Sequence, residues 1–366
     1  MNRSQAWLAF IFLSTAITSP VFGQEPDYRY DTNKVILPFL SYTPETSLMF
    51  GGLTMIQFKP GDASPETRAS QVIFSGIYSL NKQLMVELTP NIILPEEKWL
   101  FEGRYEYSFF PDLFWGIGPF TKSDDETDIE FRSLHLQQVI LKKFGSNLYA
   151  GAVLRWSNLS NIEFLDENGL PITDPDIKGS GGSTLPGIGF SVRHDRRNSI
   201  TYPTKNHYLE ITGLNHPGFL GSSHSHSSLL FDARKYVDLW NDERSILAFH
   251  FQSRLTSGEL PFQEYSRLGG REIMRGYYEG RFRDTNAAQV QAEYRQAFHR
   301  RMGFSLFMAA GEVWNRFDEF SLDNPKYSAG AGFRFNLNPA DTTNLRIDYG
   351  IGKHGSGLYI TLGEAF

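Results

Sequence analysis

Apolar and polar residues alternate along most of this chain with a period of two. Across Tyr327–Leu337, every second residue is apolar, and the residues between them are small, polar or charged. The stretch Trp99–Phe109 shows the same pattern, with aromatic residues on one face and Glu102, Arg104 and Glu106 on the other. Because successive side chains of a strand point to opposite faces, this period predicts β-strands.

The length of the alternating stretches decides between two kinds of β protein. Most are about 9–14 residues long, which suits a strand that crosses a membrane obliquely, whereas strands of soluble sandwiches are nearer ~5–6 residues. Charged residues on the polar face suit a wet lumen. We therefore predict an all-β fold, a transmembrane antiparallel β-barrel of sixteen strands. The predicted strands are 33–41, 47–58, 66–79, 82–91, 96–109, 128–144, 147–158, 183–194, 205–214, 225–238, 243–256, 286–298, 303–314, 326–337, 344–351 and 357–366.

The connections between these strands alternate in length. Those after odd-numbered strands include the long segments 110–127, 159–182 and 257–285, whereas those after even-numbered strands are mostly short, as at 145–146 and 239–242. Bacterial barrels have long outer loops and short periplasmic turns. This phase predicts that both ends of the barrel lie on the periplasmic side.

Composition agrees with a barrel and excludes several other classes. The 30 Phe, 17 Tyr and 33 Gly suit lipid-facing rings, interfacial girdles and close bends. Beyond the N-terminal segment no stretch reaches the ~18 uninterrupted apolar residues of a spanning helix. The chain has no Cys and therefore no disulfide framework. Its net charge of −6 argues against nucleic acid as a partner.

The N-terminal segment has the features of a secretory signal. Arg3 supplies a positive start, Ala6–Ile17 an apolar core, and Val21–Gly23 a small-residue cleavage site. A membrane anchor is the alternative, but the core is too short to span a bilayer. We predict a signal peptide over 1–23, a short periplasmic stub over 24–32, and an outer-membrane barrel over 33–366. The stub is too short for a folded domain, which needs roughly 50 residues.

Several short motifs occur in one order along the chain and together resemble a known family. The sequence is similar to the barrel of the BamA/TamA family, the bacterial surface antigen superfamily of outer-membrane assembly factors and two-partner secretion transporters. The similarity covers most of the mature chain. The motifs are the turn Asp195–Thr204 with Asp195, Arg197, Pro203 and Thr204, the loop Gly269–Tyr277, Glu293–Arg295, Gly311–Trp314, Gly330–Arg334, Leu345–Gly350, and the terminal Phe366.

This resemblance implies that the sixth extracellular loop folds back into the lumen. Its arginine–glycine–aromatic motif is Arg275, Gly276 and Tyr277 here, and the arginine reaches carboxylates on the inner wall. A buried guanidinium needs such a partner, and its planar fork suits a carboxylate. Glu293 points inward by its place in the alternation and is the first candidate, with Asp348 the second. The alternative is an ordinary solvated loop arginine.

The chain departs from the family pattern at three points. Ala309 stands where the family usually has an aspartate, which puts the usual partner of the loop arginine in doubt. Asn206 stands where a glycine is expected after the turn motif. The family's assembly factors usually carry periplasmic POTRA domains, whereas this sequence resembles a barrel-only form. A role in assembly then requires a separate periplasmic partner protein.

Both ends of the predicted barrel carry a feature of interest. Pro38 falls inside the first strand, where it cannot donate to a ladder. One interpretation is that Pro38 weakens the seam between the first and last strands, so that the seam can part towards lipid as a lateral gate. The alternative is that it occupies a position where the backbone makes no ladder hydrogen bond. At the other end, the alternation predicts an outward face of Leu358, Ile360, Leu362 and Phe366, similar to the C-terminal signal that barrel-assembly machinery recognises.

Candidate chemistry is sparse. His224 and His226 lie two residues apart, but the sequence shows no third ligand, so no metal site is predicted. A barrel hydrolase needs a Ser–His pair oriented by a third polar group. His250 and Ser253 lie on opposite faces of one strand, so no such site is predicted.

We therefore expect a non-enzymatic protein of the outer membrane of a diderm bacterium, without a cofactor. Its expected role is protein translocation, or membrane insertion and assembly. The expected partners are outer-membrane lipids and, during biogenesis, the barrel-assembly machinery. The first alternative function is a general diffusion channel in which the loop only narrows the pore, and the second is a barrel hydrolase.

Overall fold

The computed structural model describes residues 32–61, 63, 67–166, 169–172, 177–321, 325–338 and 343–366. The predicted signal peptide (1–23) and residues 24–31 of the predicted stub lie outside the described residues. Within the described part, sixteen long strands occur: β1 (Asn33–Thr43), β2 (Ser47–Phe58), β3 (Ser70–Ser79), β4 (Leu84–Ile93), β5 (Trp99–Phe109), β7 (Thr127–Gly145), β8 (Leu148–Leu165), β9 (Ser183–Asp195), β10 (Asn206–His216), β11 (His226–Asp238), β12 (Ser245–Gly258), β15 (Asn286–Ala297), β16 (Met302–Trp314), β17 (Lys326–Asn338), β18 (Thr343–Gly352) and β19 (Gly355–Leu362).

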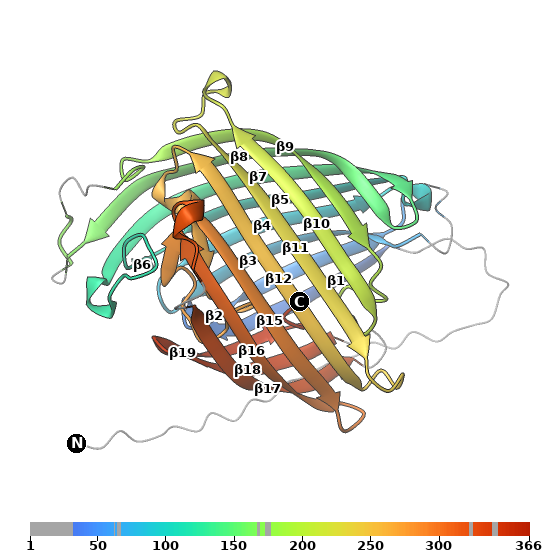
Figure 1. The fold of residues 1–366 in the computed structure, drawn as a ribbon. Helices are drawn as coiled ribbons and strands as arrows, with labels where there is room; N and C mark the ends of the chain where they lie inside the picture. The colour runs from blue at the N-terminus through green and yellow to red at the C-terminus, as the bar shows by residue number, and fades with distance from the viewer. Residues whose placement is uncertain are drawn as a thin grey trace, which may run out of the picture. The chain divides into compact units, whose positions relative to one another are not determined.

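These strands form one antiparallel sheet that closes on itself. Each long strand pairs with the next along the chain, and β19 pairs with β1. Figure 1 shows the sheet curling round into a barrel. Each of the sixteen predicted strands corresponds to one long strand, so the predicted fold class is confirmed.

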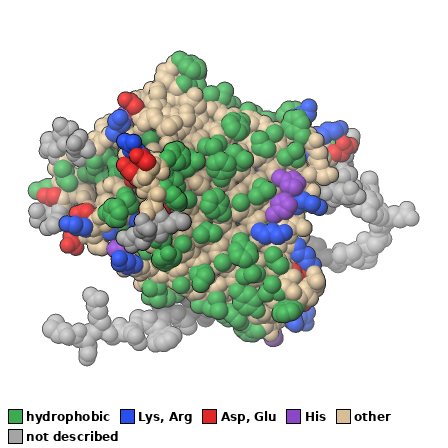
Figure 2. All heavy atoms as spheres, viewed as in Figure 1, with side chains coloured by type: hydrophobic (Ala, Val, Ile, Leu, Met, Phe, Trp, Pro, Cys, Tyr) green, Lys and Arg blue, Asp and Glu red, His purple; other side chains and the backbone are tan. Residues whose placement is uncertain are grey.

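The two faces of the sheet differ as the alternation predicts. Large apolar side chains are exposed on the outside, and Figure 2 shows them spread over the strands, with charged groups gathered nearer the ends. Inward positions are polar and buried, as with Gln291, Glu293 and Arg295 of β15. Among the described residues, no helix is both long enough and apolar enough to span a membrane.

The connections contain short elements of their own. The end of the barrel with the long connections is called the loop end below, and the opposite end is called the turn end. At the loop end, the short strand β6 (Asp112–Phe114) pairs with the start of β7. The connection 259–285, called loop 6, contains the paired strands β13 (Ser266–Leu268) and β14 (Phe282–Asp284). Single 3-10 turns are η1 (Pro95–Glu97), η2 (Ser123–Asp125), η3 (Gly218–Leu220), η4 (Phe262–Glu264) and η5 (Phe317–Glu319).

The junction between the first and last strands is much shorter than its neighbours. β1 pairs with β2 along its whole length, but between the described strands β1 and β19 one residue pair is in register, Tyr42 with Ile360. Ser41 Oγ also donates to the carbonyl oxygen of Ile360 at 2.6 Å. Pro38 lies in the part of β1 that has no registered partner on β19. The seam is therefore joined near the loop end and unpaired towards the turn end.

The end of the chain differs from the prediction. The prediction that the last strand continues to Phe366, with that ring facing outward, is wrong, because β19 ends at Leu362 and Phe366 is buried. The chain turns at Gly363, whose φ is +81°. Glu364 then bonds to Arg334 at 2.9 Å, and the Phe366 ring lies 5.0 Å from that of His250. Because β1 offers no ladder here, the polar partners inside the barrel draw the terminus inward.

Candidate functional site

Loop 6 passes from β12 into the lumen and back to β15. Its tip is compact because several residues adopt positive φ angles, among them Gly269, Gly270, Met274 and Gly276. Glycine tolerates this region without strain. Leu268, Ile273, Met274, Tyr277 and Phe282 of the loop form an apolar cluster with Ala287, Ala309 and Val313 of β15 and β16. The loop is thus packed against the inner wall as a plug.

Arg275 lies at the tip of this plug with no exposed surface. Its guanidinium donates to the carboxylates of both Glu293 on β15 and Asp348 on β18. The same group lies 3.6 Å from the centroid of the Phe307 ring on β16, which adds a cation–π contact. The structure thus brings Arg275 together with both carboxylates that the sequence suggested, rather than leaving it in solvent.

The two carboxylates belong to a larger buried network. Glu293 also accepts from Arg295 at 2.8 Å, and Asp348 accepts from Arg334 at 2.5 Å. Among the described residues, four guanidinium groups meet three carboxylates, so each acid keeps a cation even without the loop. This set, called the lumen cluster below, is Arg275, Arg295, Arg334, Arg346, Glu293, Asp348 and Glu364.

The other two residues of the loop motif contact the wall as well. Gly276 has φ +110°, and a Cβ there would lie 2.7 Å from the backbone nitrogen of Ile351. Its N–H donates to the hydroxyl of Tyr359 at 3.0 Å. Tyr277 donates from its hydroxyl to the Tyr327 carbonyl at 3.1 Å. The motif therefore requires an arginine for charge, a glycine for close approach and a tyrosine for a second polar contact.

Ala309, the departure from the family pattern, lies in the apolar cluster beneath loop 6. An aspartate is not needed at this position because Glu293 and Asp348 supply both carboxylates for Arg275. Sequence reasoning missed Arg334, Arg346 and Glu364 as members of the network. Arg334 and Arg346 were detectable, since both lie on the inward face by their place in the alternation.

The turn motif after β9 is stabilised by its own side chains. Arg197 and Asp195 form a two-point contact, with Nη2 and Oδ2 2.8 Å apart. Thr204 is buried next to Pro203, and Asn198 Nδ2 donates to its hydroxyl at 2.7 Å. Asn206 adopts a φ of +73°. Asparagine tolerates this left-handed conformation better than most residues, which explains how it replaces the expected glycine.

A second contact holds loop 6 nearer the loop end of the barrel. Glu264 of η4 accepts from Arg155 of β8 at 2.8 Å and from Arg254 of β12 at 2.7 Å. Burial raises the pKa of Glu264, but the positive charges of Arg155 and Arg254 outweigh the effect of burial. The pKa therefore lies well below its usual value of 4.5.

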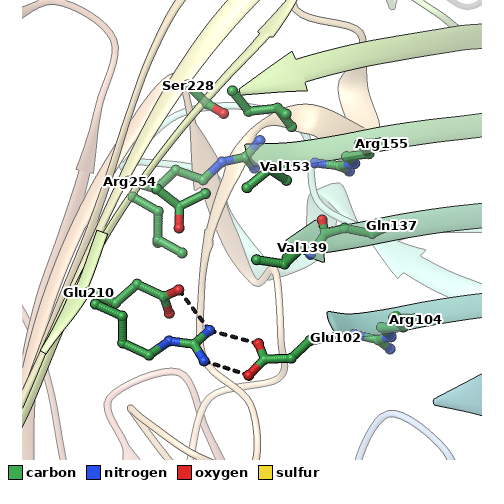
Figure 3. A pocket seen from close by; sticks show the side chains of 14 residues that line it. Glu102, Arg104, Gln137, Val139, Val153, Arg155, Glu210, Ser228 and Arg254 are labelled. Atoms are coloured by element: carbon green, nitrogen blue, oxygen red, sulfur yellow. Dashed lines mark hydrogen bonds and ion pairs between the residues drawn. The ribbon is translucent and has the colours of Figure 1, made fainter. Parts of the chain in front are cut away.

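These arginines line a cavity of about 280 Å³ inside the barrel (Figure 3). Three other charged residues of the cavity lining form ion pairs with one another: Arg193 donates to Glu102 at 2.6 Å and to Glu210 at 3.0 Å. Apolar side chains such as Val139 and Val153 complete the lining. The cavity shows that loop 6 leaves some of the lumen unfilled.

The side chains considered for hydrolysis do not form a catalytic pair. Ser253 donates from Oγ to the carbonyl oxygen of Ala287 at 3.1 Å, so its hydroxyl is engaged with the sheet. His250 lies with Nε2 3.2 Å from a carboxylate oxygen of Asp232 and packs against Phe366. Each side chain thus has a structural contact of its own.

Comparison with known proteins agrees with this architecture. The Omp85 superfamily domain matches residues 122–366. No curated protein matches the sequence. Among solved structures, BamA from Haemophilus ducreyi lacking POTRA domains 1–3 is similar, with a TM-score of 0.61 and 14% identity over 91% of this chain and 70% of that one.

Two further similar structures are CdiB from Acinetobacter baumannii and CdiB from Escherichia coli. The first has a TM-score of 0.55 and 12% identity, and the match covers 91% of this chain and 65% of that one. The second has a TM-score of 0.55 and 11% identity, and the match covers 91% of this chain and 67% of that one. At such identities the likeness shows the fold alone. The domain match covers more than half of the chain and includes the loop-6 motif and its wall partners. The chain therefore belongs to the Omp85 superfamily.

Proposed function

We propose that this protein is a non-catalytic outer-membrane factor of the BamA/TamA type that translocates proteins or inserts them into the membrane. In this proposal residues 1–23 direct export, and the turn end of the barrel faces the periplasm of a diderm bacterium. The observation that carries it is the burial of Arg275 between Glu293 and Asp348, because it holds a long loop inside the bore of an Omp85 barrel.

The short seam supports a lateral opening as part of this function. In hydrocarbon, each backbone group without a hydrogen-bond partner costs several kcal/mol. The edge of β1 around Pro38 has no registered partner on β19, so another strand can complete it by pairing edge to edge. A client strand would gain ladder hydrogen bonds there, while Tyr42 and Ile360 keep the barrel closed nearer the loop end.

The proposed partners follow from this arrangement. Outer-membrane lipids surround the apolar outer face, and the barrel-assembly machinery inserts the chain itself. A periplasmic partner protein would present the client at the turn end. Loop 6 would stay in the lumen or move within it while the seam opens.

A disulfide across the seam tests the proposal. Because the sequence has no cysteine, the pair Tyr42→Cys and Ile360→Cys can be oxidised without competing thiols. We expect oxidation to slow insertion of an unfolded barrel client into liposomes that contain the protein, and reduction to restore it. The matched control is Tyr42→Cys with Leu48→Cys, which links β1 to β2 at a registered pair. Equal client insertion by the two oxidised proteins would remove the lateral gate from the proposal.

Planar-bilayer recording distinguishes the alternative of a general diffusion channel. A plugged translocation factor should give small, flickering currents that grow when Arg275 is replaced. A large and steady current from the unchanged protein would instead favour a diffusion channel. Release of fatty acids from phospholipid by the purified protein would favour a hydrolase.

A further inference from the structure

Loop 6 meets the barrel wall at a cluster of histidines that the function above does not use. His216 is the last residue of β10 and His226 the first of β11, and the two are registered opposite each other in the sheet. Their rings stack with centroids 4.4 Å apart. Glu264 of loop 6 completes the cluster, and one ligand atom from each of the three residues lies within 4.8 Å of the others. All three side chains are buried.

The hydrogen bonds of the two histidines show which ring nitrogen of each carries the proton and which is free to bind a metal. His216 Nδ1 lies 3.1 Å from the Pro186 carbonyl oxygen, and His226 Nδ1 lies 3.0 Å from that of His224. A carbonyl oxygen only accepts, so each Nδ1 carries the proton and each Nε2 keeps its lone pair. Neither Nε2 has a hydrogen-bond partner among the described residues. Histidine ligands of metals show this same pattern, donating from one nitrogen to a carbonyl while the other binds the ion.

We propose that His216, His226 and Glu264 bind one divalent transition-metal ion, with Zn²⁺ as the best-fitting species. Imidazole nitrogens select such metals over Ca²⁺ and Mg²⁺, which take oxygen ligands. Three protein ligands leave a fourth tetrahedral position for water. Ligand atoms around tetrahedral zinc lie roughly 3.4 Å apart. Because the present distances reach 4.8 Å, side-chain rotation has to bring the three groups together by up to about 1.4 Å.

The surroundings give the ligands both room and orientation. Gly187 accommodates the His216 ring, because a Cβ at that position would lie 2.6 Å from Cε1 of the imidazole. Arg155 and Arg254 hold the carboxylate of Glu264 in place, and both also line the neighbouring cavity (Figure 3). Their positive charges oppose a cation. The site is therefore expected to bind its metal reversibly.

The consequence is a second, metal-dependent anchor for loop 6. His216 and His226 belong to the wall and Glu264 to the loop, so one ion would join the plug to β10 and β11. This anchor is separate from Arg275, which meets β15 and β18. The inference concerns metal binding and does not depend on the translocation role.

Calorimetric titration of ZnCl2 into untagged, chelator-treated protein in detergent tests the proposal. We expect one Zn²⁺ per barrel and slower trypsin cleavage of loop 6 at the exposed Arg267 once zinc is added. His216→Ala should weaken binding at least about tenfold and abolish the protection. It leaves the contacts of Glu264 with both arginines intact, so a loosened loop cannot mimic the result.

Matched variants distinguish zinc binding at the proposed site from zinc binding at other histidines. His224→Ala keeps the backbone carbonyl that orients His226 and should bind zinc as before. His194 and His207 hydrogen bond to each other at 3.0 Å at the turn end, so His207→Ala measures background binding there. With Co²⁺ in place of Zn²⁺, visible absorption should appear and be lost in His216→Ala and Glu264→Gln. No zinc binding, or binding that His216→Ala and Glu264→Gln leave unchanged, overturns the proposal.

Discussion

Replacing Arg275 by methionine should release loop 6 while leaving the barrel intact. The substitution keeps most of the side-chain volume but removes two charge-assisted hydrogen bonds, to Glu293 and Asp348, each contributing roughly 1.5–3 kcal/mol. It also removes the contact with Phe307. Glu293 keeps its ion pair with Arg295, and Asp348 keeps its ion pair with Arg334. The substitution therefore leaves neither carboxylate buried without a positively charged partner. We expect a net loss of about 3 kcal/mol in loop anchoring.

Trypsin cleavage at Arg271 measures this loss directly. Arg271 is exposed, and it lies four residues before Arg275 in the same loop. Where opening is fast relative to cleavage, the cleavage rate follows the population of open loop. Since about 1.4 kcal/mol corresponds to a tenfold change, the substitution should speed cleavage on the order of a hundredfold. An increase of less than about threefold would refute the anchoring role of Arg275.

Glu293→Gln is the informative companion because it acts on the barrel as well as on the loop. It leaves four guanidinium groups with two carboxylates in the lumen cluster. Removing one member of a buried ion pair typically costs about 3–5 kcal/mol, so urea unfolding in detergent should show a larger loss than Arg275→Met does. In the double variant, the losses of loop anchoring should sum to less than the two single effects. Strict additivity would mean that Arg275 and Glu293 are not coupled.

Three further outcomes follow from the structure. Gly276→Ala places a methyl group against the Ile351 backbone at a φ that alanine resists, so loop cleavage should increase with little change in barrel unfolding. Deleting Phe366 removes a buried ring, which typically contributes about 3–5 kcal/mol, and should lower both membrane assembly and the heat resistance of the folded band on gels; normal values of both would refute this role. Because the pKa of Glu264 is depressed in the folded protein, its anchoring contribution is complete above pH 4.5 and is lost as the pH falls below that value. The protection of loop 6 amides against hydrogen exchange, corrected for the intrinsic exchange rate at each pH, should then fall only under acid conditions. In Glu264→Gln this protection should no longer depend on pH.

Alternation was sufficient to place the strands because a barrel wall has one apolar and one polar face. Each predicted strand has a counterpart, and the inward parity of Glu293 and Asp348 identified the carboxylates that Arg275 meets. The largest boundary errors lie at strand ends. The predicted strand 147–158 continues to Leu165, and the predicted strand 66–79 begins at Ser70, since pairing rather than composition decides where a ladder starts and ends.

Contacts that depend on strand register and on the path of loop 6 could not be predicted from one sequence. The pairing of His226 with His216, rather than with the neighbouring His224, depends on the register of β10 and β11. Glu264 reaches this pair only because loop 6 folds inward. A local motif of two histidines could not reveal a ligand 38 residues away in the chain, counted from His226 to Glu264.

The sequence by itself determined the number and phase of the strands, the long loop and the inward carboxylates, because these depend on local periodicity and side-chain direction. Only the tertiary structure decided the short seam between β1 and β19, the inward turn of Phe366 and the position of the loop-6 anchors. Those features arise where the two ends of the sheet meet and where a loop enters the lumen. There, ladder hydrogen bonds compete with buried ion pairs, and the balance depends on partners far apart in the chain.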